Sequence, residues 1–538
     1  MSAQLLTSLV ATFGAYGLYK LITFFYGEWT SPIRILPGPP SPSWFYGNLK
    51  EIWQSEKSAV HEKWVKEHGP TITYKALFGV NRLYTTDLKA LGHILSNTNI
   101  YQKPEPSRYS LSRILGTGVL VVEGEQHKQQ RRVMNPAFGA LQVRELTEIF
   151  VDKSVELRDI WMNEISKEGD KAKVDALSWL SRLTLDVIGL AGFSYQFNAL
   201  SNDPEKNELN RAFAKIFNTN SQVSLSVIVP RLIPALRWIP VENDAETRQA
   251  RQTMDRIGRE LLDSSKAKLA KSGTVEKDSL RSKDLLTLLL RANMATDLPE
   301  HQRMSDEDVL AQVPTFLVAG HETTSTATTW ALFALCDKLE LQQKLREELL
   351  TVSTDNPTMD ELNALPYLDA VVRETLRLHP PVVATMRAAI ADDVIPLGVP
   401  FTDRNGKVHD SIQIREGQTI LIPIAMVNRI ESLWGPDAHE YRPERWLGKL
   451  PDAVSGIPNI WGNTLSFLAG PRACIGYRFS LVETKAILFT LLRAFEFELA
   501  VPVEDIGQKA TIVQRPILRS DPKAGNQLPL YIRPVQRT

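Results

Sequence analysis

The chain has 538 residues, 43% of them hydrophobic, which is enough for one large domain with an extensive core. Its 62 basic and 62 acidic residues cancel, so bulk electrostatics argue against a nucleic-acid-binding protein. Two cysteines, Cys336 and Cys474, cannot form a disulfide framework, and the bulk of the chain therefore fits a reducing compartment.

An almost wholly apolar segment, Leu5 to Tyr26, lies near the N-terminus. Its length is close to the roughly 20 residues that span a bilayer. Since Lys20 and Arg34 both lie on the C-terminal side, the positive-inside rule places the rest of the chain in the cytosol. A cleaved signal peptide is the weaker alternative, because no basic residue precedes Leu5 and no clear cleavage site follows. We predict a single uncleaved membrane anchor over residues 1–30, with a helix lying in the membrane interface as the alternative.

The next segment is rich in proline. It reads Ile-Leu-Pro-Gly-Pro-Pro over residues 35–40, which excludes a helix and favours a stiff, extended connector. We predict a hinge at residues 31–43 and a catalytic domain at residues 44–538. A generic linker would have the same composition.

The first half of the domain should be mainly helical after one small hairpin. A helix is expected near residues 57–67, and two β-branched runs at 71–78 and 82–86 predict the hairpin. A later helix should place His127 and Arg131 one turn apart on one face. Loops are expected where proline, glycine or charged residues gather, at residues 101–122, 223–240 and 264–283.

A long helix is predicted over residues 306–336, with Ser305 as its N-cap. It contains Ala-Gly-His-Glu-Thr-Thr at residues 319–324, where glycine and clustered threonines weaken helical hydrogen bonding. An interrupted helix would leave a groove for dioxygen and a water molecule, with Thr323 donating a hydrogen bond and Glu322 relaying protons. A close helix contact through small residues, with an incidental acid, explains these residues equally well.

Beyond residue 370 the pattern changes to polar pairs and short strands. Glu374 and Arg377 lie on one helical face, which by default makes a weak surface pair. Arg387 falls in a strand-like run, and a turn is expected at Asn405-Gly406. Further strands are expected at residues 394–423, 493–501 and 528–532. The predicted fold class is therefore mainly α with small β-sheets, an α+β arrangement.

The most informative segment, residues 467–476, reads Phe-Leu-Ala-Gly-Pro-Arg-Ala-Cys-Ile-Gly. Its glycines allow close backbone approach, and apolar residues recur at helical spacing from Ile475 onward. A cysteine at a helix start lies near partial positive charge, which favours the thiolate, a metal ligand. Arg472 could bind a carboxylate. Together these groups suit haem, although most lone cysteines are small buried hydrophobes.

The pattern Phe-x-x-Gly-x-Arg-x-Cys-x-Gly resembles the haem-binding loop of the cytochrome P450 monooxygenases and matches it at every fixed position. Three other segments resemble further family motifs in the expected order. The resemblance extends from the proline-rich segment to the final strands, and it implies a cytochrome P450 fold preceded by one transmembrane helix. In its His-x-x-x-Arg variant and its Gly-His-Glu-Thr-Thr helix, the chain is most similar to fungal members.

The resemblance assigns a role to each residue that occupies a matching position. Cys474 would ligate the iron of haem b, in a loop formed with Phe467, Gly470 and Gly476. The haem propionates would be held by four basic residues: Arg472, Arg131, Arg387 and His127, where the family often has tryptophan in place of His127. Proton delivery would fall to Glu322 and Thr323. A buried clamp supporting the cysteine loop would consist of Glu374, Arg377 and Arg445.

The activity implied is oxidation of a lipophilic small molecule, such as a terpenoid, sterol, fatty acid or aromatic xenobiotic, by dioxygen. Electrons would come from NADPH through the flavins of a separate NADPH-cytochrome reductase, with a cytochrome b-type donor as a second source. We expect a single-pass protein of the endoplasmic reticulum membrane, active in fungal secondary metabolism or detoxification. Two alternatives are a haem-thiolate isomerase or dehydratase without a reductase and a non-catalytic haem sensor. The Glu322–Thr323 pair argues against both.

Overall fold

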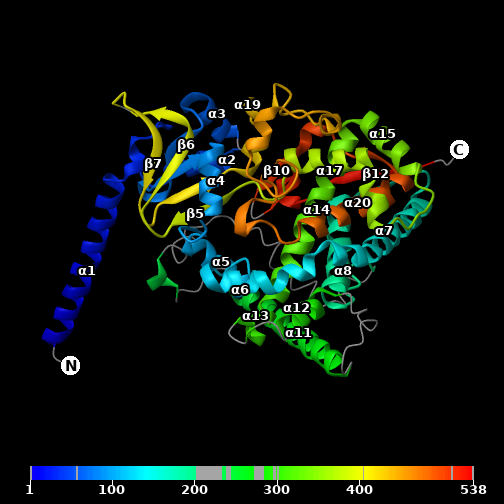
Figure 1. The fold of residues 1–538 in the computed structure, drawn as a ribbon, viewed down its shortest axis with the longest axis horizontal. Helices are drawn as coiled ribbons and strands as arrows, with labels where there is room; N and C mark the ends of the chain where they lie inside the picture. Colours follow the sequence, from blue (N-terminus) through cyan, green and yellow to red (C-terminus); the bar gives the residue numbers. More distant parts are fainter. Residues whose placement is uncertain are drawn as a thin grey trace.

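The structure is a computed structural model that describes residues 3–55, 59–201, 233–237, 244–271, 284–294, 299, 302–403, 405–510 and 513–535. Figure 1 shows a sheet-rich part beside the N-terminal helix and a larger body of helices beyond it. The prediction of a mainly helical fold with small sheets is therefore confirmed.

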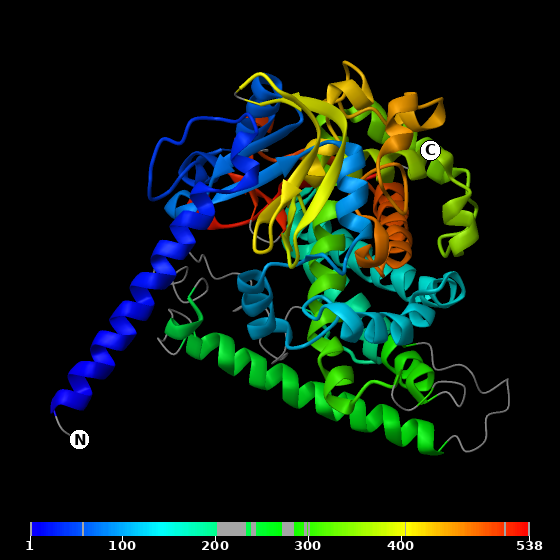
Figure 2. The same cartoon turned by 60° about the vertical axis from the view of Figure 1, so that its left-hand side comes forward.

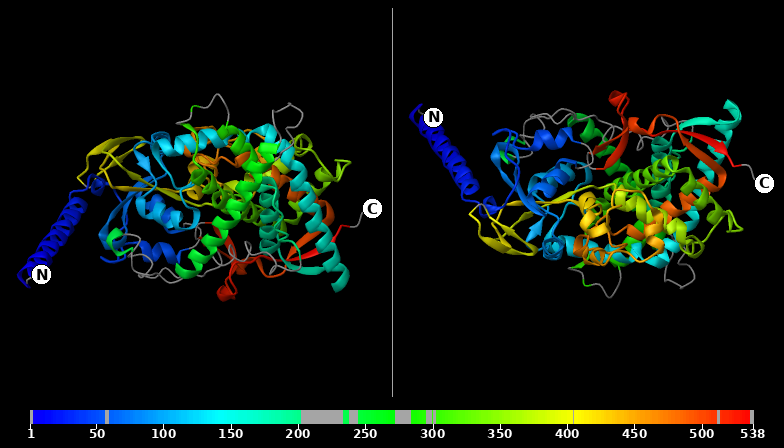
Figure 3. Two further views of the ribbon diagram at one scale, coloured as in Figure 1. Left: turned by 90° about the horizontal axis from the view of Figure 1, so that it is seen from below. Right: turned by 90° about the horizontal axis from the view of Figure 1, so that it is seen from above.

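Helix α1 (Ala3–Trp29) projects away from the body, and only its C-terminal end meets the rest of the chain (Figures 1 and 2). Figure 3 shows the same projection from below and from above. Within the described residues, α1 and α8 (Ala176–Phe193) are long and apolar enough to cross a membrane. The apolar stretch of α8 is 72% buried in the core, whereas that of α1 is 0% buried, so α1 is the one suited to an anchor.

The proline-rich segment after α1 is held against the body. Leu36 is fully buried, and the backbone N–H of Thr73 donates to the carbonyl oxygen of Pro37 at 3.0 Å. At the end of α1, the backbone N–H of Asn81 donates to the carboxylate of Glu28 at 2.7 Å. The connection between α1 and the body is thus made of docked residues with defined partners.

The largest sheet has five strands in the order β1-β2-β8-β5-β3. The predicted hairpin is present as β1 (Thr71–Lys75) and β2 (Asn81–Thr85), which pair antiparallel. Strand β8 (Thr419–Ile422) lies parallel to β2 and links it to β5 (Thr385–Ala389). Strand β3 (Tyr101–Gln102) closes the sheet at the far edge.

Three smaller antiparallel sheets complete the strands of the described chain. One is the predicted hairpin that turns near Gly406, where φ is 82°. Their members are β6 (Asp393–Thr402) with β7 (Val408–Ile414), β10 (Ile506–Ala510) with β11 (Gln514–Leu518), and β4 (Ala172–Asp175) with β12 (Pro529–Pro534) and β9 (Phe495–Leu499).

The helical body packs around α14 (Gln312–Asp337), which crosses its centre in Figures 1 and 2. Helix α8 lies along α14, and α20 (Tyr477–Ala494) packs against both α14 and α7 (Ala140–Glu168). Apolar side chains of these helices form the largest core cluster. The remaining longer helices are α3 (Ala59–His68), α4 (Leu88–Ser96), α6 (Gly124–Met134), α11 (Asp244–Lys271), α12 (Leu285–Met294), α15 (Leu339–Leu350) and α17 (Pro366–Leu378).

Two of the predicted loops contain α-helix. Helix α5 (Glu105–Leu115) occupies the predicted loop at 101–122, because its prolines lie at the helix start, where a missing N–H costs nothing, and Gly116 ends it with a φ of 68°. Helix α11 continues through Lys271 into the predicted loop at 264–283. The rest of that loop, and all of 223–240 except 233–237, lies outside the described residues.

The predicted long helix is in fact two helices. The short α13 (Asp306–Leu310) is capped as predicted by Ser305, whose hydroxyl accepts from the Asp308 N–H at 3.1 Å. Helix α14 begins after a break, so Pro314 lies in its first turn, where the missing N–H is harmless. The predicted interruption near 319–324 is wrong, since α14 is continuous there. Gly320 packs tightly on α8 and compensates for its poor helix propensity.

Candidate active site

The segment around Cys474 is fixed by backbone contacts. The Cys474 N–H donates to the carbonyl oxygen of Phe467 at 2.9 Å. Gly470 has a φ of 67°, and a Cβ there would lie 2.3 Å from the carbonyl oxygen of Leu95, so this position requires glycine. Gly476 has a φ of −90°, a conformation open to any residue. The loop therefore depends on one of its two flanking glycines for its own backbone conformation.

The Cys474 side chain is accessible, whereas Cys336 is buried. This accessibility contradicts the interpretation of Cys474 as a small buried hydrophobe. The protein nevertheless desolvates the thiol and raises its pKa, against smaller opposing effects of the Gly476 N–H and Arg131. Helix α20 begins at Tyr477, three residues after Cys474, and the thiolate ligand stays a prediction. A coordinating metal would still remove the proton.

One face of α14 is open in the middle of an otherwise buried helix. Val318, Ala319, Gly320 and Thr323 are partly exposed, while their neighbours along the helix are buried. The Thr323 hydroxyl donates to the carbonyl oxygen of Ala319 at 2.7 Å. Among these four residues, Thr323 carries the hydroxyl, and Ala319 and Gly320 are small.

Arg387 on β5 is a deeply buried cation. Its side chain is 2% exposed and donates to the carbonyl oxygen of Met386 at 2.8 Å and to the Thr385 hydroxyl at 3.2 Å. Burial lowers its pKa to about 10, and no carboxylate of the described residues forms an ion pair with it. A buried charge requires a partner, so this arginine suits an anionic ligand.

Further positive charges surround Arg387. Burial and the charges of Arg472, Arg387 and Arg108 hold the pKa of Lys103 well below its usual range. Burial, Lys103 and Arg131 lower the pKa of His127 to about 4, so His127 is a neutral hydrogen-bond partner. Lys103 and Arg108 were missed in the sequence, since they lie in the segment predicted as a loop.

The two remaining predicted arginines make specific contacts. Arg131 on α6 donates to the carbonyl oxygen of Ala473 at 2.6 Å and to Asn135 at 2.9 Å, so α6 directly supports the cysteine loop. Arg472 forms an ion pair with Glu123, a carboxylate that sequence reasoning also missed. One carboxylate therefore faces several cations, and the cluster retains capacity for additional negative charge.

This donor set fits the haem that the sequence pattern implies. Cys474 offers an accessible soft ligand, and Arg387 and Arg472 offer buried positive charge for two propionates. Haem bound to a thiolate supplies the chemistry of O–O bond cleavage.

Glu374 is the centre of a fully buried clamp. Its carboxylate accepts from Arg377 at 2.8 and 2.9 Å, from Arg445 at 3.0 Å and from the Trp446 indole at 2.9 Å. The side chains of Glu374 and Arg377 are both 0% exposed, so the default reading as a weak surface pair is wrong. The structure brings together all three residues that the resemblance assigned to a clamp, and adds Trp446.

Asn428 connects this clamp to the cysteine loop. Arg377 donates to the Asn428 backbone carbonyl at 3.0 Å. The Asn428 side chain accepts from the Leu465 N–H and donates to the Ser466 hydroxyl, both at 2.9 Å. Since Phe467 follows directly, the buried ion pairs and the loop of Cys474 form one hydrogen-bonded unit. Asn428 carries no motif of its own, and the sequence offered no signal for it.

The side chains of Glu322 and Thr323, the predicted proton-delivery pair, point in different directions. Glu322 is 8% exposed, and its carboxylate pairs with Arg515 on β11 and lies 3.3 Å from Nε2 of His321. Although burial raises the pKa of Glu322, His321 and Arg515 together lower it to about 2. Thr323 instead lies on the open face of α14. Among the described residues no hydrogen bond joins the two side chains.

A second buried acid lies where α20 meets α14. Glu483 is 0% exposed, and within the described residues neither of its carboxyl oxygens has a hydrogen-bond partner. The neighbouring Thr324 hydroxyl donates instead to Ser480 at 3.2 Å. Burial has the larger effect and raises the pKa of Glu483 well above its usual range, while the Thr324 hydroxyl opposes this rise. Burial therefore favours the protonated form of the Glu483 carboxyl group.

Replacing Glu483 with glutamine should flatten the dependence of stability on pH. A group whose pKa is raised by folding contributes stability at low pH and loses it as pH rises, here from about pH 5 upward. One such proton changes the free energy of unfolding by at most about 1.4 kcal/mol per pH unit. Thermal unfolding of wild type and Glu483→Gln across this range measures the difference. The exposed Glu347→Gln should leave the pH profile unchanged, and a wild-type profile in Glu483→Gln would contradict the neutral acid.

Comparison with known proteins agrees with this geometry. The family described as Cytochrome P450 matches residues 37–519. Cytochrome P450 monooxygenase 205 of Postia placenta is 56% identical over 99% of this chain and 98% of its own length. Cytochrome P450 monooxygenase claP of Ampulloclitocybe clavipes is 37% identical over 94% of each chain, and a ganoderic acid synthetase of Ganoderma lucidum is 33% identical over 91% of this chain and 92% of its own. With the family matched over most of its length and with relatives of this similarity, the chain belongs to the cytochrome P450 family and is a fungal-type monooxygenase.

Proposed function

We propose that this protein is a membrane-anchored haem-thiolate monooxygenase that oxidises a lipophilic small molecule. The observation that carries the proposal is the accessible Cys474 thiol together with the buried Arg387, which has no carboxylate partner among the residues that the structure describes. A thiolate ligand and two propionates would satisfy both groups at once. Because one relative is named a ganoderic acid synthetase, terpenoids are the first substrate class to test, ahead of sterols, fatty acids and aromatic xenobiotics.

The residues around the proposed haem would have separate roles in holding the cysteine loop, binding the propionates and delivering protons. Arg131 holds the cysteine loop through the Ala473 carbonyl, and Arg387, Arg472 and His127 would receive the propionates together with Lys103. The small side chains of α14 would leave space for substrate next to the Thr323 hydroxyl. Protons would reach that hydroxyl from solvent through Glu322.

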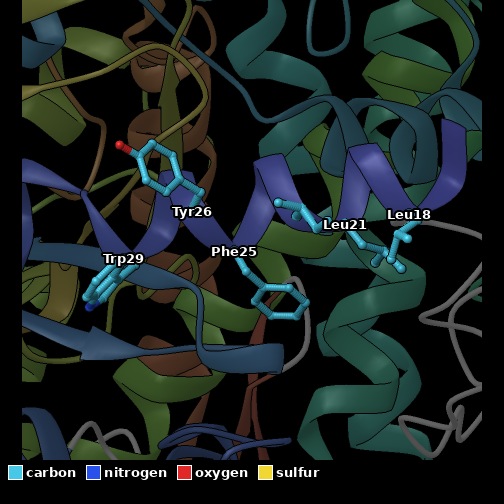
Figure 4. A pocket seen from close by; sticks show the side chains of 6 residues that line it. Leu18, Leu21, Phe25, Tyr26 and Trp29 are labelled. Carbon is cyan, nitrogen blue, oxygen red and sulfur yellow. The ribbon is translucent and has the colours of Figure 1, made fainter. Parts of the chain in front are cut away.

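Helix α1 would hold the protein in the endoplasmic reticulum membrane with the catalytic domain in the cytosol. The pocket in Figure 4 is lined by six apolar or aromatic side chains that all belong to α1, among them Leu18, Phe25 and Trp29. A hollow formed by one exposed helix suits a lipid chain better than a substrate. Tyr26 and Trp29 at its end fit the aromatic belt of the membrane interface.

Electrons would come from a separate NADPH-cytochrome reductase, with a cytochrome b-type protein as a second donor. Lys128 and Arg132 are candidate contacts, because both lie on α6, the helix whose Arg131 contacts the cysteine loop. Arg132 donates to Gln302, and Lys128 pairs with the exposed Glu125. A basic surface of this kind suits an acidic electron donor.

The carbon monoxide difference spectrum of the reduced, full-length protein in membranes tests the proposal. A red-shifted thiolate–carbon monoxide band is expected, and titration of the oxidised protein with a terpenoid, a sterol, a fatty acid and a polycyclic aromatic should change the haem spin state for one class. Folded protein that is supplied with haem and shows no such band would contradict the proposed function. A band without any spin-state change would contradict only the proposed substrates.

Replacing Thr323 with alanine should divert electrons from product to hydrogen peroxide. The variant loses the only hydroxyl among the partly exposed α14 residues, so proton delivery beside the haem becomes less efficient. We expect roughly a tenfold lower ratio of product to NADPH consumed. Thr328→Ala, a buried threonine that donates to Thr324 on the same helix, is the control. Unchanged coupling in Thr323→Ala would remove the proposed role.

A further inference from the structure

His321 and Glu322 lie side by side in the interior, and their hydrogen bonds restrict where protons can be. Nδ1 of His321 lies 3.1 Å from the carbonyl oxygen of Leu317. A carbonyl oxygen only accepts, so Nδ1 must carry a hydrogen. Nε2 of the same ring lies 3.3 Å from a carboxyl oxygen of Glu322. Two lone pairs cannot face each other at this distance, so one proton lies between Nε2 and Glu322.

Arg515 decides which of the two groups holds that proton. Its guanidinium contacts the other carboxyl oxygen of Glu322, and the side chains of all three residues are at most 11% exposed. A cation at this oxygen stabilises the carboxylate, so the shared proton belongs to His321 as long as Arg515 is in place. Without that cation, a buried pair favours its uncharged form, with the proton on Glu322.

The position of Arg515 is itself well defined. The preceding residue, Gln514, accepts a hydrogen bond from the Trp330 indole of α14 at 2.9 Å and donates from its backbone to Pro381 at 2.8 Å. Strand β11 is therefore attached to the same helix that carries Glu322, two turns further along. The contact between Arg515 and Glu322 joins residues 193 positions apart.

The other polar and ionisable groups near His321 and Glu322 interact with atoms other than the Glu322 carboxylate. Helix α8 presents Thr184, whose hydroxyl donates to the backbone carbonyl of His321 at 3.0 Å. On α20, Glu483 adjoins Thr324 and not Glu322. The strand β9 carboxylate Glu498 acts on Cys336 at the far end of α14. Among the described residues, His321 and Arg515 are thus the groups that act on the Glu322 carboxylate.

We propose that His321 and Glu322 form a proton-loading pair for the oxygen-activating site, in which Arg515 keeps the shared proton on the imidazole. His321 would be the proton store, Glu322 the group that passes the proton toward Thr323, and Arg515 a positioning residue that acts through Glu322. The relay to Thr323 rests on the proposed role of Glu322 and Thr323 in proton delivery. The presence of a shared proton between His321 and Glu322 does not depend on that role. Only a proton moves between the two side chains, so no oxidant or further reactant is needed.

Infrared spectroscopy of the full-length, haem-loaded protein tests where the proton lies. At about pH 7 the wild-type protein should show no carboxylic acid band that disappears in Glu322→Gln. In Arg515→Gln such a band should appear, and it should vanish again when Glu322→Gln is added. Arg519→Gln is the matched control, because Arg519 lies at the end of the same hairpin and donates to the Glu504 backbone on the surface. This measurement requires no substrate and no turnover.

Reduction of oxygen with NADPH and reductase, without added substrate, tests the relay. His321→Phe and Arg515→Gln should each raise the ratio of hydrogen peroxide to water by about tenfold, and Arg519→Gln should not. In the Glu322→Gln background, His321→Phe and Arg515→Gln should have no further effect, because both act through Glu322. Additive losses would indicate a merely structural role.

Two results would overturn the proposal. One is a protonated Glu322 in the wild-type protein near neutral pH, and the other is the absence of its acid band in Arg515→Gln. If the infrared bands change as expected but the peroxide ratio does not, the shared proton is supported and the relay to Thr323 is contradicted. A missing carbon monoxide band would contradict the proposed monooxygenase function while leaving the infrared result valid, so the two failures are distinguishable.

Discussion

Replacing Cys474 with alanine should abolish the thiolate-type haem spectrum and all monooxygenase activity. Cys474 is the accessible thiol of this chain, and the other cysteine is buried at the far end of α14. Burial raises the pKa of the Cys336 thiol, so it is an inert core residue that cannot substitute as ligand. The carbon monoxide difference spectrum, recorded with haem in excess, measures the loss.

Two variants make this result specific. Cys336→Ala should retain the full thiolate spectrum, because it removes a buried side chain far from the loop. Cys474→Ser should fold, since the hydroxyl occupies the same accessible position, but should lack the red-shifted band. Persistence of that band in Cys474→Ala would show that the ligand assignment is wrong. Haem loading should also release the proton of the Cys474 thiol, whose pKa is raised in the protein alone.

Replacing Glu374 with glutamine should destabilise the domain by about 3–5 kcal/mol and impair haem retention. The change leaves Arg377 and Arg445 buried with only an amide between them, and an uncompensated buried charge is costly. Because Arg377 also contacts Asn428, which holds Leu465 and Ser466, the loss should extend to the cysteine loop. Thermal unfolding and haem content per mole of purified protein measure both effects.

An exposed ion pair provides the control for the clamp. Asp452 pairs with Lys449 at 3.0 Å, and the two side chains are 86% and 84% exposed. Asp452→Asn should change stability by less than about 0.5 kcal/mol, because solvent screens exposed pairs. If Glu374→Gln were as mild as this control, the clamp would be dispensable. If it yields no folded protein, chemical denaturation of the milder Arg445→Lys still measures the contribution of the clamp.

Features that depend on neighbouring residues follow from the sequence, whereas contacts between distant segments do not. The hairpin turn near Gly406 and the helix N-cap at Ser305 were predicted correctly, because turns and caps depend on adjacent residues. The errors at α5 and α14 have one cause. Proline and glycine predict helix breaks by propensity. In α5, however, they mark the helix start and end, and in α14 tight packing on α8 outweighs propensity.

What the sequence alone determined is the membership of the family and the motifs around Cys474, Glu322 and Glu374, because each motif is a short run in which neighbours along the chain act together. What only the tertiary structure decided is the set of partners that these motifs meet. Asn428, which binds the segment before the cysteine loop, and Arg515, which pairs with Glu322, come from distant parts of the chain. No periodicity or spacing in the sequence predicts such contacts. The ionisation of Cys474 and Glu322 was likewise undetermined, since desolvation and nearby charge depend on how the whole chain packs.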